Sequence, residues 1–131
     1  MTGILIVSHS AKVAEGARDM ASAMAGEGVR ILAAGGTNDG RLGTDFAAIS
    51  EALGKLVEGG GEAVVIMDLG SALMTVRAVL DELGEAAMRV FLADAPIVEG
   101  AVVAAVEASL GSRGSEVRMA AEGVKAMQKL A

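Results

Sequence analysis

The sequence predicts an α/β fold: one doubly wound domain, with a mainly parallel four-stranded sheet and helices on both faces. Short apolar runs alternate with longer segments whose apolar residues recur at helical spacing, the pattern of repeated β-α units. Hydrophobic residues make up 53% of the 131, yet only two are Phe and none is Trp or Tyr. Such an aliphatic composition suits a buried sheet covered by Ala-rich helices. No linker or internal repeat divides residues 1–131, so we expect one domain.

The predicted strands are the four short apolar runs, residues 3–7, 29–33, 63–67 and 88–92. The third run is apolar throughout, as expected of a strand buried on both faces. Parallel neighbours need crossover connections, which are right-handed in nearly all known folds. We therefore expect a helix between each pair of successive strands.

Five helices are predicted from apolar residues spaced three or four apart: residues 11–25, 46–57, 71–83, a helix beginning at Pro96, and 115–130. Met20, Met24 and Met127 fall on apolar stripes of the first and last helices, so we expect them in the core. Three small residues of the fourth helix are expected to pack either an interface or the sheet: Ala101, Ala104 and Ala105.

Composition excludes several classes of protein. The net charge is −6 and no basic stripe forms, which argues against binding to nucleic acid. Without cysteine there is neither a disulfide framework nor a thiolate metal site. The longest apolar stretches are far shorter than the roughly 20 residues of a membrane span. We see no signal peptide, so a cytoplasmic location is expected.

Polar and glycine residues follow each predicted strand. Ser8-His9-Ser10 follows the first, the glycine-rich loop 35–44 the second, Asp68-Leu69-Gly70-Ser71 the third, and Asp94-Ala95-Pro96 the fourth. In open parallel sheets, ligands bind beyond the carboxyl ends of the strands, near the point where strand order reverses. A purely structural protein does not require these residues at one edge, so the pattern predicts a site there.

His9 is the candidate nucleophile because it is the only histidine and no cysteine or tyrosine competes with it. Histidine ordinarily has a pKa of about 6.5, so much of the imidazole is neutral near pH 7 and can accept a phosphoryl group. The phosphoramidate formed would need hydrogen-bond donors, which helix starts supply. The candidate phosphate-binding residues are Ser10, Gly43, Thr44, Gly70 and Ser71.

Structural roles are equally open for the same residues. A lone histidine at a strand end is often a capping or core residue, and Asp68 can cap the helix that follows it. Ser8 and Ser10 can also be caps, and loop 35–43 can be an ordinary connection. The residues alone leave these alternatives standing.

Four motifs in order resemble a known family: Ile6-Val7-Ser8-His9-Ser10, Gly43-Thr44-Asp45, Met67-Asp68-Leu69-Gly70-Ser71-Ala72 and Ala95-Pro96-Ile97-Val98-Glu99-Gly100-Ala101. Together they look like the EIIA-like domain of the phosphotransferase subunit of dihydroxyacetone kinase, DhaM, within the mannose-type EIIA superfamily. The resemblance spans essentially the whole chain.

The resemblance implies a phosphotransferase with a phosphohistidine intermediate, no cofactor and no metal. The carrier HPr of the phosphoenolpyruvate-dependent system would phosphorylate His9, which would pass the group to ADP held on the kinase's nucleotide-binding subunit. Asp68 would orient His9 by accepting a hydrogen bond from Nδ1–H, which leaves Nε2 to carry phosphate. The resemblance also implies a homodimer. The HPr-like and enzyme-I-like domains of some relatives are expected to be separate proteins here.

Three other functions are alternatives to this one. A mannose-type sugar-transporter EIIA domain passes phosphate to an EIIB domain, but typically reads Gly-His-Gly and Asp-Thr-Trp-Gly-Gly-Ser where this chain has Ser8-His9-Ser10 and Asp68-Leu69-Gly70-Ser71. A noncatalytic module would hold a free anion at the same edge. A hydrolase using Ser8 or Ser10 lacks a second histidine and a nucleophile-elbow pattern. A Walker phosphate loop is also missing, so no nucleotide site is expected.

Overall fold

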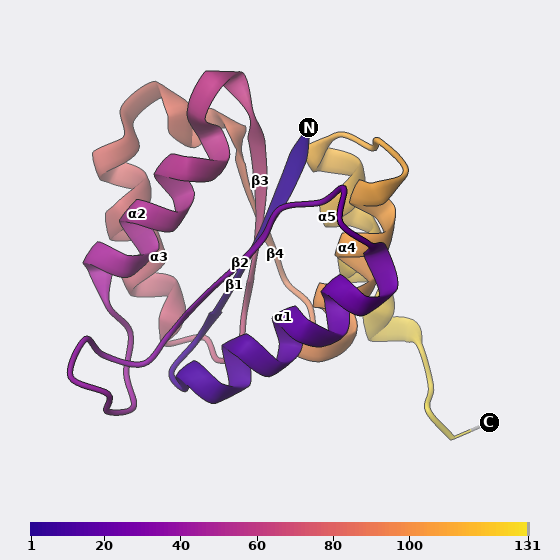
Figure 1. Ribbon diagram of the computed structural model, residues 1–131, viewed down its shortest axis with the longest axis horizontal. Helices are drawn as coiled ribbons and strands as arrows, with labels where there is room; N and C mark the ends of the chain where they lie inside the picture. Colours follow the sequence, from indigo (N-terminus) through magenta and orange to yellow (C-terminus); the bar gives the residue numbers. More distant parts are fainter. Residues whose placement is uncertain (131) are drawn as a thin grey trace.

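A computed structural model describes residues 1–130 as three layers, with the sheet between two layers of helices (Figure 1). The strands are β1 (Thr2–Ser8), β2 (Ile31–Gly35), β3 (Glu62–Met67) and β4 (Val90–Ala93). The helices are α1 (Ala11–Ala25), α2 (Phe46–Val57), α3 (Ala72–Leu83), α4 (Ile97–Ser109) and α5 (Gly114–Gly123). Three short 3₁₀ helices span Glu58–Gly60, Gly84–Arg89 and Val124–Ala126.

The sheet is parallel throughout, with strand order β2-β1-β3-β4. From β1 the chain first moves outward to β2, then returns to place β3 on the other side of β1. Strand order therefore reverses between β1 and β3, and that reversal marks the crevice where α/β folds bind ligands. The register pairs Val7 with Met67, so the residues that follow, Ser8 and Asp68, leave the sheet side by side.

Each face of the sheet has its own aliphatic core. Along β1, Ile4 and Ile6 pack under α1, α4 and α5, whereas Leu5 and Val7 pack under α2 and α3. All four side chains are completely buried. Burial of apolar surface at roughly 25 cal/mol per Å² makes these two cores the main source of stability.

The predicted α/β class, the parallel sheet and the helices on both faces are confirmed. Within residues 1–130, no helix is long and apolar enough to cross a membrane. Some boundaries were wrong. The second strand is Ile31–Gly35 rather than 29–33, because pairing with β1 continues until Ser8 faces Gly35. A Cβ at Gly35 would lie 2.5 Å from the Ser10 carbonyl oxygen, so this close approach to α1 requires glycine.

Two other boundaries differ at chain segments that form 3₁₀ helices. The fourth strand is Val90–Ala93 rather than 88–92, since Gly84–Arg89 forms a 3₁₀ helix before it. The last helix ends at Gly123, where a 3₁₀ turn begins, instead of running to residue 130. Glycine is a weak helix former, which suits this end point.

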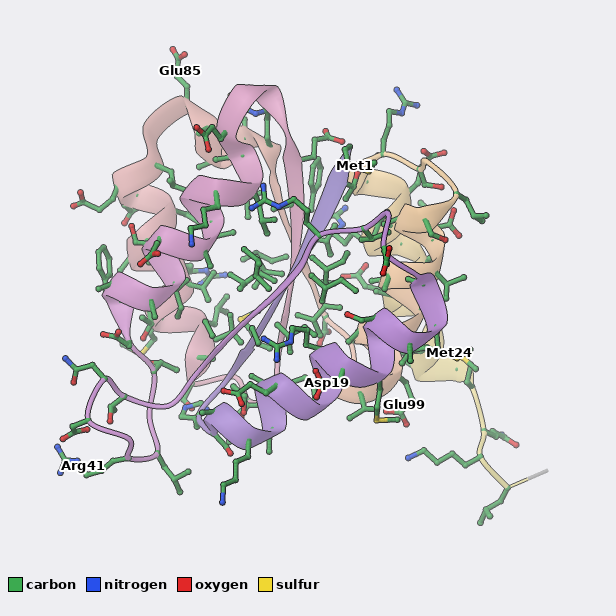
Figure 2. All side chains as sticks on the ribbon, viewed as in Figure 1. Met1, Asp19, Met24, Arg41, Glu85 and Glu99 are labelled. Atoms are coloured by element: carbon green, nitrogen blue, oxygen red, sulfur yellow. The ribbon has the colours of Figure 1, made fainter. Side chains whose placement is uncertain are left out.

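The prediction that Met20, Met24 and Met127 lie in the core was wrong: they are 54%, 66% and 65% exposed. Figure 2 shows Met24 on the outside of α1. The inward face of α1 is instead Ala14, Ala17 and Ala21. A stripe of alanines has the same period as the methionine stripe, and it lets α1 approach α4 more closely. Ala101, Ala104 and Ala105 are also fully buried inside the chain, so they pack its own core.

Candidate active site

The two central strands place an imidazole beside a carboxylate at the strand-order reversal. His9 follows β1 directly, and Asp68 follows β3 directly. A hydrogen bond of 3.1 Å from Asp68 N–H to the Val7 carbonyl extends the β1–β3 pairing to this point. The His9 side chain is 26% exposed and the Asp68 side chain 16% exposed. The pair is therefore partly shielded yet still open to a reactant.

Asp68 holds both the backbone and the ring of His9. Its Oδ1 and Oδ2 lie 3.1 and 3.3 Å from His9 Nδ1, and Oδ2 also accepts the backbone N–H of His9 at 3.0 Å. An ionised carboxylate can only accept hydrogen bonds, so in this contact Nδ1 carries the proton. In a neutral imidazole the other nitrogen, Nε2, then keeps its lone pair. The geometry thus leaves Nε2 as the unprotonated ring nitrogen.

Two more donors surround the Asp68 carboxylate. The Ser8 hydroxyl donates to Oδ2 at 2.9 Å, and the Leu69 backbone N–H donates to Oδ1 at 2.7 Å. Partial burial is the largest single influence on the pKa of Asp68 and raises it. The hydrogen bonds from His9, Ser8 and Leu69 together outweigh burial, so the pKa of Asp68 lies below its ordinary value. Asp68 is therefore ionised near neutral pH.

Nε2 of His9 faces the start of α3, where Ser71 Oγ lies 2.9 Å away. Because Nε2 is unprotonated, the Ser71 hydroxyl donates this bond. Ser71 stands at the N-cap position of α3 but makes no side-chain capping bond. Within residues 1–130, the backbone N–H groups of Gly70 and Ser71 have no hydrogen-bond partner. The imidazole therefore faces unused donors at a helix N-terminus, where the helix dipole favours an anion.

Asp68 is not the cap of α3, which was the structural alternative for this residue. Its carboxylate accepts from Leu69 N–H, while α3 begins at Ala72 with Ser71 before it. Ser10, in contrast, does cap a helix: its hydroxyl accepts the Val13 N–H of α1 at 3.3 Å. Asp68 therefore binds the imidazole, whereas Ser10 caps a helix.

The β2–α2 loop contacts the backbone of His9 rather than its ring. Gly43 N–H donates to the His9 carbonyl at 2.8 Å. Gly43 has φ +147°, and a Cβ there would lie 2.8 Å from a Thr37 methyl carbon, so the contact requires glycine. Thr44 is not brought to the imidazole: its hydroxyl pairs with that of Thr75 on α3 at 2.7 Å.

Sequence reasoning placed Ser8 at this edge as a helix cap or a hydrolase nucleophile, and missed its role as a partner of Asp68. The Ser8 side chain is completely buried, which makes it unsuited to be the exposed nucleophile of a hydrolase. The available signal was a polar residue ending an otherwise apolar strand, immediately before the only histidine.

A cavity of about 310 Å³ opens next to Asp68, between the carboxyl ends of β3 and β4. Its lining combines apolar side chains such as Leu69 and Leu73 with Arg77 and Asp94. Within residues 1–130, no group of three or more His, Asp or Glu is arranged to hold a metal ion.

Comparison with known proteins connects this geometry to a family. The EIIA-man family model, described as PTS system fructose IIA component, matches residues 3–117. The phosphoryl donor subunit DhaM of PEP-dependent dihydroxyacetone kinase 2 from Listeria innocua is 38% identical over 108 residues, 82% of this chain and 86% of its own length. The DhaM of Escherichia coli is 35% identical over 116 residues, which cover 86% of this chain and 24% of that longer protein.

A solved structure shares the fold of this chain. The crystal structure of unknown function protein EF1359 superposes with a TM-score of 0.85 at 32% identity, covering 99% of this chain and 98% of the other. The match extends over the sheet and both helical layers. With the family model covering most of the sequence and DhaM subunits similar over more than four-fifths of it, this chain belongs to the EIIA-man family.

Proposed function

We propose that this chain is the phosphoryl donor subunit of a phosphoenolpyruvate-dependent dihydroxyacetone kinase, a phosphotransferase with a phosphohistidine intermediate. His9 accepts the group from HPr and delivers it to ADP bound on the nucleotide-binding subunit of the kinase. The observation that carries the proposal is the contact of Asp68 with Nδ1 of His9, which leaves Nε2 unprotonated and facing solvent-accessible donors. The DhaM relatives are named as phosphoryl donor subunits, which agrees with this chemistry.

The transfer requires little chemistry from the protein beyond positioning. The Nε2 lone pair attacks phosphorus, the new N–P bond forms, and the bond between phosphorus and the donor's histidine breaks. Nε2 carries no proton, so none has to leave. Asp68 stays ionised and stabilises the positive charge that develops on the ring, through its contact with Nδ1–H.

The phosphoryl oxygens would meet the start of α3. There the N–H groups of Gly70 and Ser71 are available as donors, and the Ser71 hydroxyl joins them once it releases Nε2. The helix dipole favours the negative charge of the phosphoryl oxygens. No other side chain lies within 4 Å of a Cβ built on Gly70, so this side is open for an incoming group. Ser10 and Gly43 act indirectly, by capping α1 and by binding the His9 carbonyl. Thr44 would have to release Thr75 to reach a phosphate.

The decisive measurement is the mass of the protein after incubation with phosphoenolpyruvate, enzyme I and HPr. We expect a gain of one phosphoryl group, lost again in acid, as expected of a phosphoramidate. A noncatalytic anion-binding module would take up no covalent label. Uptake should proceed in EDTA and without nucleotide. Rapid formation of ATP from the phosphorylated protein and free ADP alone would make the chain itself a kinase, which contradicts the proposal.

A second candidate function follows from the matching family model, which is described as PTS system fructose IIA component. In that case the phosphoryl group would pass to an EIIB domain of a sugar transporter. Offering the phosphorylated protein an ADP-loaded kinase subunit and, separately, an EIIB domain distinguishes the two. Loss of the label only to EIIB would replace the first assignment.

The assembly is part of the proposal. We propose that residues 1–131 act as one carrier domain, forming a homodimer in the cytoplasm, and that nucleic acid and membranes are not its partners. Sedimentation equilibrium of the purified chain tests the homodimer directly. A monomer at all concentrations would remove that element and leave the phosphoryl chemistry untouched.

A further inference from the structure

A buried hydroxyl lies directly beneath the candidate active site. Of residues 1–130, only two polar or charged ones are buried, Thr2 and Ser8, and they occupy opposite ends of β1. Burying a hydroxyl is costly unless it is hydrogen-bonded. Ser8 meets this requirement with two contacts: Oγ lies 3.0 Å from the backbone nitrogen of Ser10 and 2.9 Å from Asp68 Oδ2.

The chemistry of the partners sets the direction of both bonds. The backbone N–H of Ser10 can only donate, so Ser8 Oγ accepts there. The Asp68 carboxylate can only accept, so the hydroxyl proton of Ser8 points to Oδ2. Donation therefore runs in one direction, from the start of α1 through Ser8 to Asp68. The carboxylate then holds the proton of His9 Nδ1 from the other side.

The Ser8 bond adds a side-chain anchor on Oδ2 to the backbone donors that hold the carboxylate. The other donors to Asp68 are backbone N–H groups, from His9 and Leu69, and the imidazole itself. Among residues 1–130, Ser8 is thus the only side chain besides the imidazole that donates to the carboxylate. A turn of the carboxylate about its bond to Cβ that carried both oxygens away from Nδ1 would release the proton that sets the tautomer of the ring.

We propose that Ser8 is a positioning residue: its buried hydroxyl holds Asp68 so that the His9 ring keeps its proton on Nδ1 and presents Nε2 for transfer. This inference deepens the proposed function and rests on it for its meaning. Ser8 touches neither the reacting nitrogen nor any group transferred to it, so it acts only through Asp68.

The test combines a tautomer measurement with a rate. His9 is the only histidine, so the imidazole nitrogen signals in an NMR spectrum of ¹⁵N-labelled protein need no assignment. The unphosphorylated native protein should show the Nδ1–H tautomer. In Ser8→Ala the Nε2–H tautomer should become populated, and uptake from HPr should slow about tenfold, since a hydrogen bond to a charged group is lost. Ser8→Cys, with a weaker donor of similar size, should lie between the two.

Thr2→Val is the matched control. It removes the other buried hydroxyl of β1, which donates to the Ser112 carbonyl at 2.9 Å. Like Ser8→Ala it should lower the unfolding midpoint, but it should leave tautomer and uptake rate unchanged. A Ser8→Ala protein with a lower unfolding midpoint but the native tautomer and rate would overturn the proposal.

Failure of the proposed function gives a different result. The tautomer is read without any phosphoryl donor, so it reports on the hydrogen bonds around the ring and not on transfer. Suppose that the native protein took up no phosphoryl group while Ser8→Ala still shifted the tautomer. The carrier assignment would then be wrong, but the positioning of Asp68 by Ser8 would be supported. If Ser8→Ala and Ser8→Cys both kept the native tautomer, the positioning role would fall whatever the native protein does with HPr.

Discussion

Polar side chains have different roles at the two edges of the sheet. At the edge where strands begin, the buried hydroxyl of Thr2 and the guanidinium of Arg89 donate only to backbone carbonyls, those of Ser112, Gly61 and Val57. At the edge where strands end, the buried hydroxyl of Ser8 donates to a carboxylate that in turn holds a partly exposed imidazole. In Figure 2, Glu85 and Arg41 mark these opposite edges.

This difference separates structural from chemical polar groups. A polar side chain that donates to backbone carbonyls closes a contact inside the chain. A series of hydrogen bonds that ends at a solvent-accessible side chain can orient that side chain toward a reactant. Substitutions at the first edge should therefore affect stability alone, whereas those at the second should affect transfer.

The largest effect is expected for His9→Ala, which should abolish phosphoryl uptake from HPr. His9 supplies the only imidazole, and its partly exposed side chain contributes little to the core, so the unfolding midpoint should stay close to that of the native protein. Mass spectrometry after incubation with the phosphoryl donors measures uptake. A His9→Ala protein that still gained the phosphoryl group would remove His9 from the mechanism.

Asp68→Ala should slow uptake by roughly two orders of magnitude while leaving residual activity, because an orienting group contributes less than the nucleophile itself. The control is Asp45→Ala. Asp45 caps α2 by accepting the Ala48 N–H, so its loss should cost about 0.5–2 kcal/mol of stability and spare transfer. Equal uptake rates in the two variants would mean that Asp68, like Asp45, has only a structural role.

Gly43→Ala should reduce the uptake rate several-fold and destabilise the protein by about 1 kcal/mol or more, since the added Cβ meets Thr37 and φ is +147°. Rearrangement of the loop would release the His9 carbonyl from Gly43 N–H. Gly40→Ala is a useful comparison: its φ of +85° also strains alanine, but nothing lies within 4 Å of the new Cβ. If both variants slowed uptake equally, the contact with His9 would not be the cause.

Arg89→Ala, at the opposite edge, should lower stability by about 1–2 kcal/mol through the lost bonds to Gly61 and Val57, with no change in uptake. Chemical denaturation and the mass assay measure the two effects. A transfer defect in this variant, at an unchanged fraction of folded protein, would contradict the division between the edges.

The smallest effect concerns pH. The pKa of Asp68 is lower in the folded chain than its ordinary value of 3.8, so its ionised form stabilises the fold. That contribution is complete above the ordinary value and is lost as the pH falls through the lower, folded value. The stability difference between the native protein and Asp68→Asn should therefore shrink below about pH 4. A difference that grew on acidification would reverse the sign assigned to this carboxyl.

Local sequence patterns were enough to predict the strands that position His9 and Asp68. Four apolar runs and the helical spacing between them predict a parallel α/β sheet, and polar residues after the runs mark the edge that holds the candidate site. The face of each helix that is buried was harder to predict. Met20 and Met24 share their period with Ala17 and Ala21, and the sequence cannot say which stripe a neighbouring helix will meet.

The sequence by itself determined the fold class, the single histidine and the aspartate that follows the third strand, because these depend on periodicity, composition and order along the chain. Only the tertiary structure decided which residues meet. Strand register places Ser8 beside Asp68, sixty residues away in the chain, and directs the Thr44 hydroxyl to Thr75 instead of the imidazole. Such contacts depend on pairing between distant segments and on the angle at which helices pack, and neither leaves a local signal.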